Sequence, residues 1–325
     1  MFQLIQHIAL LLVGAVMAIL GGAGVQDLRD ISGTWTAELK NGKVFLQVRT
    51  SPPNGANSWN GDWNMGQSLA VDEFSGLPAG DERFSAAAVK FELHREAGTL
   101  AFDGAFRAGR GAGLFSFNPR AEYAAEMKAL GYTEDLPLWR RFQLAVHDVG
   151  PKYIKALVAE GYAKLTLDEV QRARNHGVNA EFLQQLKEQG VSATTLEGYI
   201  RLHDHGVRAE YVRDLKAAGF DTVAADDLVR LHDHGVRAEL IRELKSQGYK
   251  TITLEDAVRL KDHGVSPEYI ADMKDVGIKD LTLDQLVRLR DHGITPGFVN
   301  HVRARGFKDT TAEELVRLKN GGLWK

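Results

Sequence analysis

The stretch RLHDHGVRAE occupies residues 201–210 and occurs again, unchanged, at residues 230–239. Both copies belong to a longer pattern in which histidines and glycines each recur with a step of 29 residues. The histidines are His147, His176, His205, His234, His263 and His292, and the glycines are Gly161, Gly190, Gly219, Gly248, Gly277 and Gly306. Six consecutive matches at one period predict a repeat architecture from about residue 119 onward.

The first half of each repeat is predicted to form a short helix. In TLEDAVRLKDHG, residues 253–264, Thr253 and Asp256 have the spacing of a capping box, and Gly264 can take the positive φ that ends a helix. The same capping pattern recurs at Thr166/Glu169, Thr282/Gln285 and Thr311/Glu314, whereas Ala224 interrupts it.

The second half of each repeat is predicted to form another helix. In SPEYIADMKDVG, residues 266–277, Ser266 is a suitable cap, Pro267 suits the first turn and Gly277 ends the pattern. A pair of helices of roughly eleven residues each cannot bury its apolar side alone, so stacked pairs must share a continuous core. The sequence therefore predicts an α-solenoid with half a unit at 119–131, full pairs from 133 to 306, and a final first helix at 311–320.

Residues 31–118 have a different pattern, typical of a small antiparallel β domain. Apolar residues alternate on both sides of Asn41-Gly42, which is a strong hairpin signal. Residues 88–117 are predicted to form at least three more strands, and the glycine-rich RAGRGAG at 107–113 to be a β-turn. Residues 51–68 are predicted to be a long loop, in which Trp59 and Trp63 are packing or binding residues.

The N-terminus predicts export. The apolar run IALLLVGAVMAIL at 8–20 is followed by GGAG, as in a signal peptide, and the uncharged run from Ile8 to Val25 reaches 18 residues, the lower limit for a membrane anchor. Residues 1–25 are therefore predicted to be a signal peptide or an anchor, with both alternatives open. The remaining chain is expected to be periplasmic or extracellular.

Composition narrows the chemistry. The chain has no cysteine, which excludes disulfides, thiolate metal sites and a cysteine nucleophile. A net charge of −3 gives no reason to expect a nucleic-acid partner. The sequence also lacks the HExxH and Gly-x-Ser-x-Gly motifs of two hydrolase classes, and HREAG at 94–98 resembles the first only superficially.

The His-Asp-His clusters at first suggest a metal site. His203 and His205, two residues apart, do not share a helix face and cannot readily chelate one ion. The preferred interpretation is that each period-29 histidine lies at a helix C-terminus, where it complements the helix dipole. The alternative is a metal ion bridged by His203 and His232 of adjacent repeats, for which no third ligand is evident.

Two rows of basic residues follow the same period and are candidate binding residues. Each arginine of the first row has an acidic residue four positions earlier, which predicts intrahelical ion pairs on a solvated face. The alternative is a ladder that binds an acidic or extended partner. The rows are Arg172, Arg201, Arg230, Arg259 and Arg288, continued by Arg317, and Lys187, Lys216, Lys245 and Lys274.

The units at 281–307 and 257–278 resemble repeats found in exported regions of bacterial membrane proteins related to the zinc metallopeptidase family of the beta-lactam sensor-transducers. The stretch VKFELHREAGTLAFDGAFRAGRGAGLFSFNP at 89–119 resembles the β region that precedes those repeats, so the resemblance covers residues 31–322. Because the protease portion and its HExxH are absent from this sequence, the resemblance implies an extracytoplasmic recognition module and no protease activity.

The combined prediction is an α+β multidomain protein, with a small antiparallel β domain at 31–118 followed by an α-solenoid of 29-residue two-helix repeats at 119–325. The expected function is a non-enzymatic interaction or scaffold module that binds a protein or peptide on its extended surface. One alternative is an envelope sensor for a small ligand or metal ion, and another is a hydrolase with its site where the β domain meets the solenoid. No cofactor is expected, membrane contact is expected only through the N-terminal segment, and the oligomeric state is left open.

Overall fold

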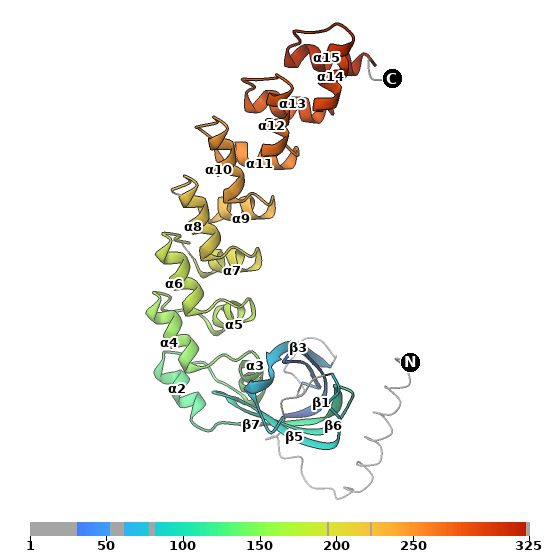
Figure 1. The fold of residues 1–325 in the computed structure, drawn as a ribbon. Helices are drawn as coiled ribbons and strands as arrows, with labels where there is room; N and C mark the ends of the chain where they lie inside the picture. Colours follow the sequence, from blue (N-terminus) through green and yellow to red (C-terminus); the bar gives the residue numbers. More distant parts are fainter. Residues whose placement is uncertain (1–30, 53–61, 78–81, 194, 222, 323–325) are drawn as a thin grey trace, which may run out of the picture. The chain divides into compact units, whose positions relative to one another are not determined.

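The computed structural model describes residues 31–52, 62–77, 82–193, 195–221 and 223–322. It has the predicted α+β architecture, a curled antiparallel sheet followed by a series of helices (Figure 1). The chain divides into two compact units, one ending at Asn175 and the other beginning at His176, and each is described by itself. The predicted N-terminal signal peptide or anchor lies outside the described residues. Within the described ranges, no helix combines the length and hydropathy that crossing a bilayer requires.

The sheet has seven strands in the order β3-β2-β1-β7-β6-β5-β4, and every neighbouring pair is antiparallel. A short 3-10 helix, η1 (Val71–Glu73), connects β3 to β4, the two strands at opposite ends of this order. The strands are β1 (Ile31–Lys40), β2 (Lys43–Thr50), β3 (Trp63–Ala70), β4 (Phe74–Ser75), β5 (Ala86–Arg95), β6 (Gly98–Arg107) and β7 (Arg110–Pro119).

Two tight turns of the sheet confirm the sequence prediction, and one loop does not. Asn41 and Gly42 join β1 to β2 with φ of 52° and 72°, the positive values that a two-residue hairpin turn requires. Ala108 and Gly109 make the equivalent turn between β6 and β7, so the turn predicted at 107–113 is correct in place but too long, because residues 110–113 belong to β7. The predicted loop at 51–68 is wrong in its last part, because β3 begins at Trp63. The inward-facing residues of β3 are only half-buried and include the polar Gln67. The alternation of apolar and polar residues that predicts a strand is therefore weak here.

Aromatic rings fill the interior of the sheet. Trp35 is 1% exposed, and its ring lies 5.1 Å from Phe91 and 5.5 Å from Phe106, measured between centroids. Phe91 and Phe102 stack at 4.7 Å. Gly104 is required here, because a Cβ at this position would lie 2.7 Å from the Trp35 ring. Among the described residues, the inside of the sheet is therefore packed with side chains.

The helices confirm the predicted half unit, six full pairs and final first helix. Each helix of a pair has nine residues, fewer than predicted, because the caps lie outside it. The half unit is α2 (Tyr123–Ala129), and the last helix is α15 (Ala312–Asn320). The pairs are α3 (Leu138–Val146) with α4 (Pro151–Ala159), α5 (Leu167–Asn175) with α6 (Ala180–Glu188), α7 (Leu196–Asp204) with α8 (Ala209–Ala217), α9 (Ala225–Asp233) with α10 (Ala238–Ser246), α11 (Leu254–Asp262) with α12 (Pro267–Asp275), and α13 (Leu283–Asp291) with α14 (Pro296–Ala304).

The predicted caps position the helix starts. Thr253 forms a capping box with Asp256, and Ser266 accepts a hydrogen bond from the amide of Tyr269. Ala224 provides no side-chain cap, as expected. Each such cap contributes about 1 kcal/mol to stability. Capping pairs are also present at Thr166/Glu169, Thr282/Gln285 and Thr311/Glu314.

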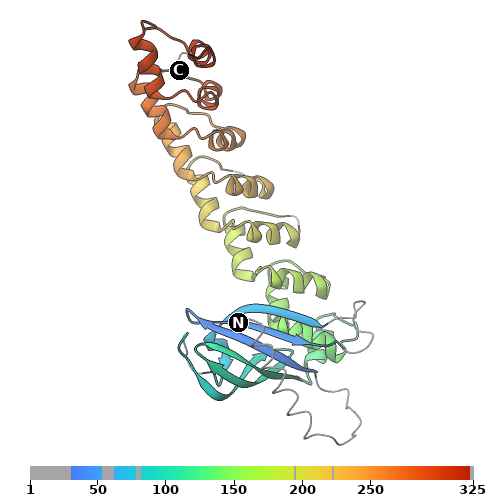
Figure 2. The same cartoon turned by 90° about the vertical axis from the view of Figure 1, so that its right-hand side faces the viewer.

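From His176 onward, first helices pack beside first helices and second helices beside second helices, forming two rows (Figure 2). The apolar sides of both rows form the core, with Val258 and Leu260 from α11 and Ile270 and Met273 from α12 all buried. The residue that follows the first glycine of each unit enters the same core, as Val265 does at 2% exposed. This packing confirms a helical-repeat solenoid core.

In the unit that ends at Asn175, α3 packs against the sheet. Phe142 is fully buried, stacking on Phe115 of β7 at 5.9 Å and contacting Trp63 of β3 at 5.3 Å. Trp139 contacts the same Trp63 ring at 5.8 Å. Trp63 is therefore a packing residue between the sheet and the first helix pair. Trp59, the other candidate in this region, lies outside the described residues.

Candidate binding surface of the helical repeats

The arginine row forms ion pairs between repeats. Arg201 pairs with Asp226 at 2.6 Å, and Arg230 pairs with Glu255 at 2.6 Å. The acidic partner lies 25 residues later, in the first turn of the next first helix, and not four residues earlier as predicted. Stacked helices bring these groups together, which spacing within one helix does not reveal. Arg259 with Asp284 and Arg288 with Glu313 continue the row, and Arg172 lies exposed on α5.

These ion pairs contribute little stability, because the side chains stay open to solvent. The arginine side chain of the Arg201–Asp226 pair is 54% exposed and the carboxylate 81%. Exposed pairs of this kind are each worth about 0–1 kcal/mol. The alternating charges of these pairs nevertheless balance one another on the exposed side of the first helices, and they favour one register between neighbouring first helices.

The lysine row caps helices. Lys245 donates from Nζ to the carbonyl of Ala218 at 2.6 Å, and Lys274 donates to the carbonyl of Gln247 at 2.7 Å. Ala218 and Gln247 are the C-terminal caps of α8 and α10, where the helix dipole favours a cation. Lys216 approaches Gly190 in the same way, since a Cβ there would lie 3.2 Å from its Nζ. Lys187, the first member of the row, is half-buried on α6.

The period-29 histidines connect successive first helices. His205 Nδ1 lies 2.9 Å from Asp233, and His234 Nδ1 lies 2.6 Å from Asp262. Since an ionised carboxylate can only accept, Nδ1 carries the proton in each pair. The histidines do cap the first helices, as predicted, but their rings bind the next repeat rather than their own carbonyls. The row also includes His176–Asp204, His263–Asp291 and His292–Asn320.

His203 and His232, the weak metal candidates, pack on rings instead. His203 lies edge-on to Phe182 with centroids 5.0 Å apart, and His232 lies edge-on to Tyr211 at 5.1 Å. Burial lowers the pKa of His203, and the nearby Arg208 guanidinium lowers it further. A cationic neighbour is a poor companion for a metal ion. In the part of the chain that the structure describes, no three metal-ligating side chains converge.

These two histidines follow a rule that was not predicted from the sequence. At this position of α5, α7, α9, α13 and α15, a basic or imidazole side chain covers a ring 21 residues earlier, whereas the residue 21 positions before Lys261 of α11 is Leu240. The signal was present in the sequence, in the recurring aromatic residues of the second helices. The cation–π members are Arg174 over Tyr153, Arg290 over Tyr269 and Lys319 over Phe298, with the cation 4.9–5.0 Å from the ring centre.

Tyrosine hydroxyls supply a further link between repeats. Tyr211 donates to the carbonyl of Val236 at 2.9 Å, and Tyr269 donates to that of Ile294 at 2.9 Å. Burial raises the pKa of Tyr269 to about 12, so its hydroxyl keeps its proton at any physiological pH. Like the basic rows, the tyrosines therefore stabilise the stack of helix pairs.

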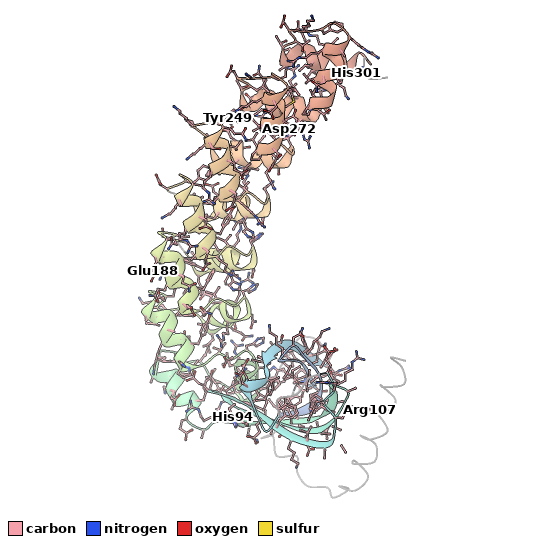
Figure 3. The ribbon with its side chains drawn as sticks, in the orientation of Figure 1. His94, Arg107, Glu188, Tyr249, Asp272 and His301 are labelled. Carbon is pink, nitrogen blue, oxygen red and sulfur yellow. The ribbon has the colours of Figure 1, made fainter. Side chains whose placement is uncertain are left out.

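The outward side of the second helices has few such contacts. Glu210, Glu239 and Glu268 recur there at one position, while the position three residues later varies between Arg213, Arg242 and Ala271. Their bonds stay within one helix, as in the Arg242–Glu239 pair at 2.6 Å. Glu188 of α6 shows the orientation of this surface, pointing away from the first helices (Figure 3). We call the exposed side of α6, α8, α10 and α12 the outer face.

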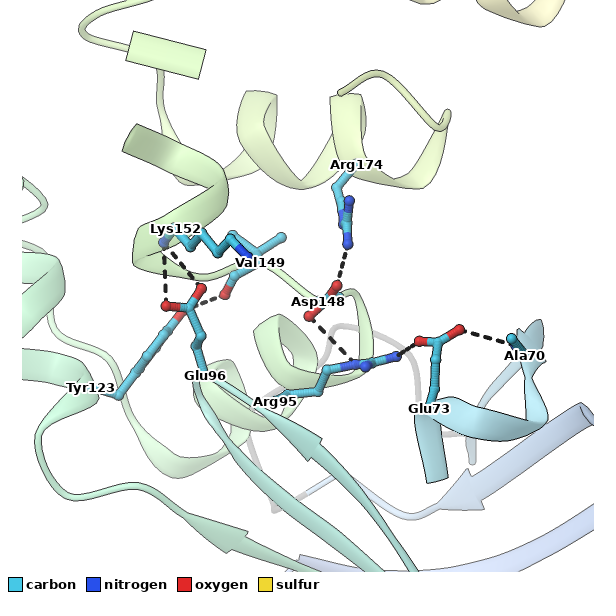
Figure 4. A network of polar contacts seen from close by, with 9 residues as sticks. All are labelled: Ala70, Glu73, Arg95, Glu96, Tyr123, Asp148, Val149, Lys152 and Arg174. Atoms are coloured by element: carbon cyan, nitrogen blue, oxygen red, sulfur yellow. Dashed lines mark hydrogen bonds and ion pairs between the residues drawn. The ribbon is translucent and has the colours of Figure 1, made fainter. Parts of the chain in front are cut away.

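A chain of alternating charges joins the sheet to the first helices (Figure 4). Arg95, at the end of β5, has a side chain only 9% exposed and lies between Glu73, at 2.8 Å, and Asp148, at 3.4 Å. Asp148 also pairs with Arg174 of α5. Its φ of 55° is the left-handed value that the later repeats assign to glycine, such as Gly177. Asp148 therefore has a strained backbone conformation, and in that conformation its carboxylate contacts both Arg95 and Arg174.

Glu96, the next residue, fixes the start of α4. Its carboxylate accepts a hydrogen bond from the amide of Lys152 at 3.0 Å, where the helix dipole favours a negative charge. A Cβ at Gly150 would clash with this carboxylate, so the glycine is required for the approach. The HREAG segment, which resembles a metalloprotease motif only superficially, thus holds the sheet and the helices together.

One serine–histidine pair lies outside these networks. Ser75 Oγ is 3.0 Å from His94 Nε2, and Thr99 lies 3.1 Å from Nδ1. Nε2 is also 3.3 Å from the carboxylate of Glu92, a contact that requires the proton on Nε2. In that state the ring cannot accept the serine proton, and the His94 side chain is 58% exposed. The pair therefore serves as a cross-strand contact on the sheet surface.

Comparison with known proteins adds no relative. A scan against protein-family models finds no match, and a search of curated proteins finds no related sequence. The resemblance to the exported repeats of sensor-transducer relatives therefore stays a prediction.

Proposed function

We propose that the protein is a non-enzymatic interaction or scaffold module of the bacterial envelope, which binds a protein or peptide partner along its helical repeats. The proposal is supported by one observation: some solenoid side chains form contacts between repeats, whereas others are exposed to solvent and have few such contacts. The arginine, lysine, histidine and tyrosine rows are engaged between repeats, while the outer face is exposed and combines a recurring glutamate with a position that changes from Gln184 to Arg213 and Ala271. Solenoids bind partners on extended surfaces of this kind.

The same observation changes which residues are expected to bind. Arg230 and Lys245 were candidates because they recur, but recurrence is what contacts between repeats require. Recognition of one partner needs differences between repeats instead. The outer-face position that holds Gln184, Arg213, Arg242 and Ala271 has such a difference. The expected export of the chain places this partner outside the cytoplasm.

The test uses the full chain as bait in an envelope extract. The variant Arg213→Glu/Arg242→Glu reverses two charges at the variable position of the outer face, and Lys40→Glu/Lys43→Glu makes the same change at exposed positions of the other unit. We expect the wild type and the control to retain the same partner and the outer-face variant to lose it. Equal retention by all three proteins would refute the outer face as the binding surface, and an absence of any retained protein would refute the module itself.

A further inference from the structure

The two edges of the sheet are protected differently. At one edge, β4 has only two residues, and β5 beside it carries Lys90 and a break in register between Ala86 and Val89. Short strands, charges and bulges of this kind keep a sheet edge from pairing with another chain. At the other edge, β3 has eight residues in unbroken register with β2, and none of them is charged or proline. In the part of the chain that the structure describes, β2 is the only strand paired with β3.

The backbone of β3 presents hydrogen-bonding groups on the side that faces away from β2, which we call the β3 edge. The amide of Val71 donates to the carbonyl of Gly42 at 3.1 Å, on the β2 side. The amide of Ala70 therefore points to the opposite side, where it donates to the carboxylate of Glu73 at 3.0 Å. Amides alternate in direction along a strand. The preceding amides that face the β3 edge are thus those of Asn64, Gly66 and Ser68.

The inward side chains of β3 are less covered than those of β2. Val44, Leu46 and Val48 of β2 are at most 2% exposed, whereas their register partners on β3 are half-buried. These partners are Leu69, Gln67 and Met65. A further strand on the β3 edge would place its own inward side chains beside them, as β2 does on the other side. The segment that fits this edge is therefore extended, with apolar residues at alternate positions.

Gly66, in the middle of β3, indicates the same kind of occupant. A Cβ at this position would lie no closer than 3.5 Å to any described atom, and its φ is not positive. Neither packing nor backbone conformation within the described chain therefore requires glycine here. Glycine inside a strand weakens it and is typical of a site where another backbone approaches closely.

We propose that the β3 edge binds an extended segment of a protein partner by strand addition. The segment continues the ladder that β2 and β3 already form. Its backbone bonds the edge amides, and its alternate apolar side chains cover Met65 and Leu69. This site lies on the sheet and goes beyond the proposed function, which concerns the outer face of the solenoid.

The probe is a fluorescent peptide that copies residues 43–50 of β2, whose inward side chains already match those of β3. The control peptide carries Leu46→Asp/Val48→Asp, and binding to the full-length protein is measured by fluorescence anisotropy. We expect saturable binding that weakens at least tenfold with the control peptide and at least tenfold with the protein variant Gly66→Pro, which deletes an edge amide. Ala87→Lys, on β5, should leave the affinity unchanged.

Hydrogen exchange separates strand addition from a loss of folding. The peptide should protect the amides of Gly66 and Ser68 in the wild type. In Gly66→Pro, the amides of Met65 and Leu69, which face β2, should stay protected. If they do not, Ser68→Lys replaces this variant, because it keeps every amide and adds a charge beside the edge, and the same tenfold loss is expected.

Three results of the peptide experiment would overturn the inference: no saturable binding to the wild type, equal binding to the wild type and the edge variants, or binding that leaves Gly66 and Ser68 unprotected. A wild-type dimer in sedimentation that the edge variants dissociate would also overturn it, by making a second copy the occupant. The outer-face experiment is independent. If the peptide fails while Arg213→Glu/Arg242→Glu still loses its partner, the β3 edge alone is excluded and the proposed function stands.

Discussion

Lys274 donates a hydrogen bond to the carbonyl of Gln247, 27 residues earlier and 2.7 Å away. The contact joins the last turn of α12 to the C-terminal cap of α10. Lys245 makes the same contact with Ala218. Because a buried carbonyl at a helix end needs a donor, the lysine row is part of the packing between second helices.

Removing one of these lysines should destabilise its repeat. Lys274→Met keeps the aliphatic part of the side chain and deletes the donor, and we expect a loss of about 1 kcal/mol. Lys279→Met, in an exposed turn, is the matched control and should cost less than half as much. Hydrogen exchange of the last amides of α10 provides the measurement. Equal protection in both variants would argue against the capping role.

Substitutions of Asp148 can test whether its left-handed backbone conformation, between the sheet and α4, is strained. Asp148→Ala removes the carboxylate that pairs with Arg95 and Arg174, and we expect a loss of about 1–3 kcal/mol. Asp148→Gly removes the same charge but suits the φ of 55°, so it should be about 1 kcal/mol more stable than the alanine variant. Urea unfolding followed by tryptophan fluorescence compares the two. A glycine variant no better than alanine would mean that the position is unstrained.

His147 should make the unit that ends at Asn175 sensitive to acid. Burial lowers its pKa from the ordinary value of 6.5, and Arg140 adds to the effect, while a hydrogen bond with Asn175 opposes it. The folded state therefore resists protonation more than the unfolded state. Stability from this group is fully present above pH 6.5, the ordinary pKa, and is lost as the pH falls from there through the lower pKa of the folded state.

The comparison uses His147→Gln, which cannot gain the proton. We expect the urea midpoint of the wild type to fall relative to that of the variant as the pH is lowered from 7 to 5. The reason is that only the wild type loses stability when residue 147 is protonated. The idea fails if His147→Gln follows the same curve as the wild type.

Coupling energies can distinguish two pairings of the arginine row, one with an acid of the next repeat and one with an acid of the same helix. A double-mutant cycle between Arg230 and Glu255 should give a coupling energy of about 0.2–1 kcal/mol that falls with added salt. A second cycle between Arg230 and Asp226, the acid four residues earlier, should give a smaller value. The exchanged pair Arg230→Glu/Glu255→Arg should recover most of the coupling. A larger coupling with Asp226 would restore the intrahelical pairing.

A zinc titration tests the remaining metal hypothesis. Since His203 and His232 pack on different rings, we expect no tight stoichiometric site that depends on both. Calorimetry of the dialysed full-length protein, compared with His203→Ala/His232→Ala, measures this. Tight binding that the double variant abolishes would show that the imidazoles leave their rings to hold an ion.

The sequence predicts the solenoid well because its signals are local. A threonine cap such as Thr253 and a stop such as Gly264 lie within a few residues of the helix that they delimit, and the period of 29 repeats them. The partners of the charged rows could not be predicted in the same way. Whether Arg230 meets Asp226 or Glu255 depends on how two helices stack, and intrahelical spacing favours the wrong acid.

The β domain shows a second limit of the sequence. The hairpin at Asn41-Gly42 was predictable because its turn chemistry is specific, whereas β3 was missed because Asn64, Gly66 and Ser68 make it look like a loop. The role of Asp148 was hidden for a related reason. It follows His147 and so resembles the His-Asp pairs of later repeats, such as His203-Asp204, although it occupies the glycine position.

The fixed offsets between contacting residues have a consequence for the evolution of chain length. Each contact of the arginine and histidine rows joins one repeat to the next. Deleting residues 224–252, one whole repeat, would therefore give Arg201 the partner Glu255 and His205 the partner Asp262. Both new partners are acidic, as the present ones are. Duplicating such a block would be equally neutral. Whole repeat units can therefore be lost or duplicated while these contacts are kept, and an exact copy such as RLHDHGVRAE at 201–210 and 230–239 is compatible with the same set of contacts in both repeats.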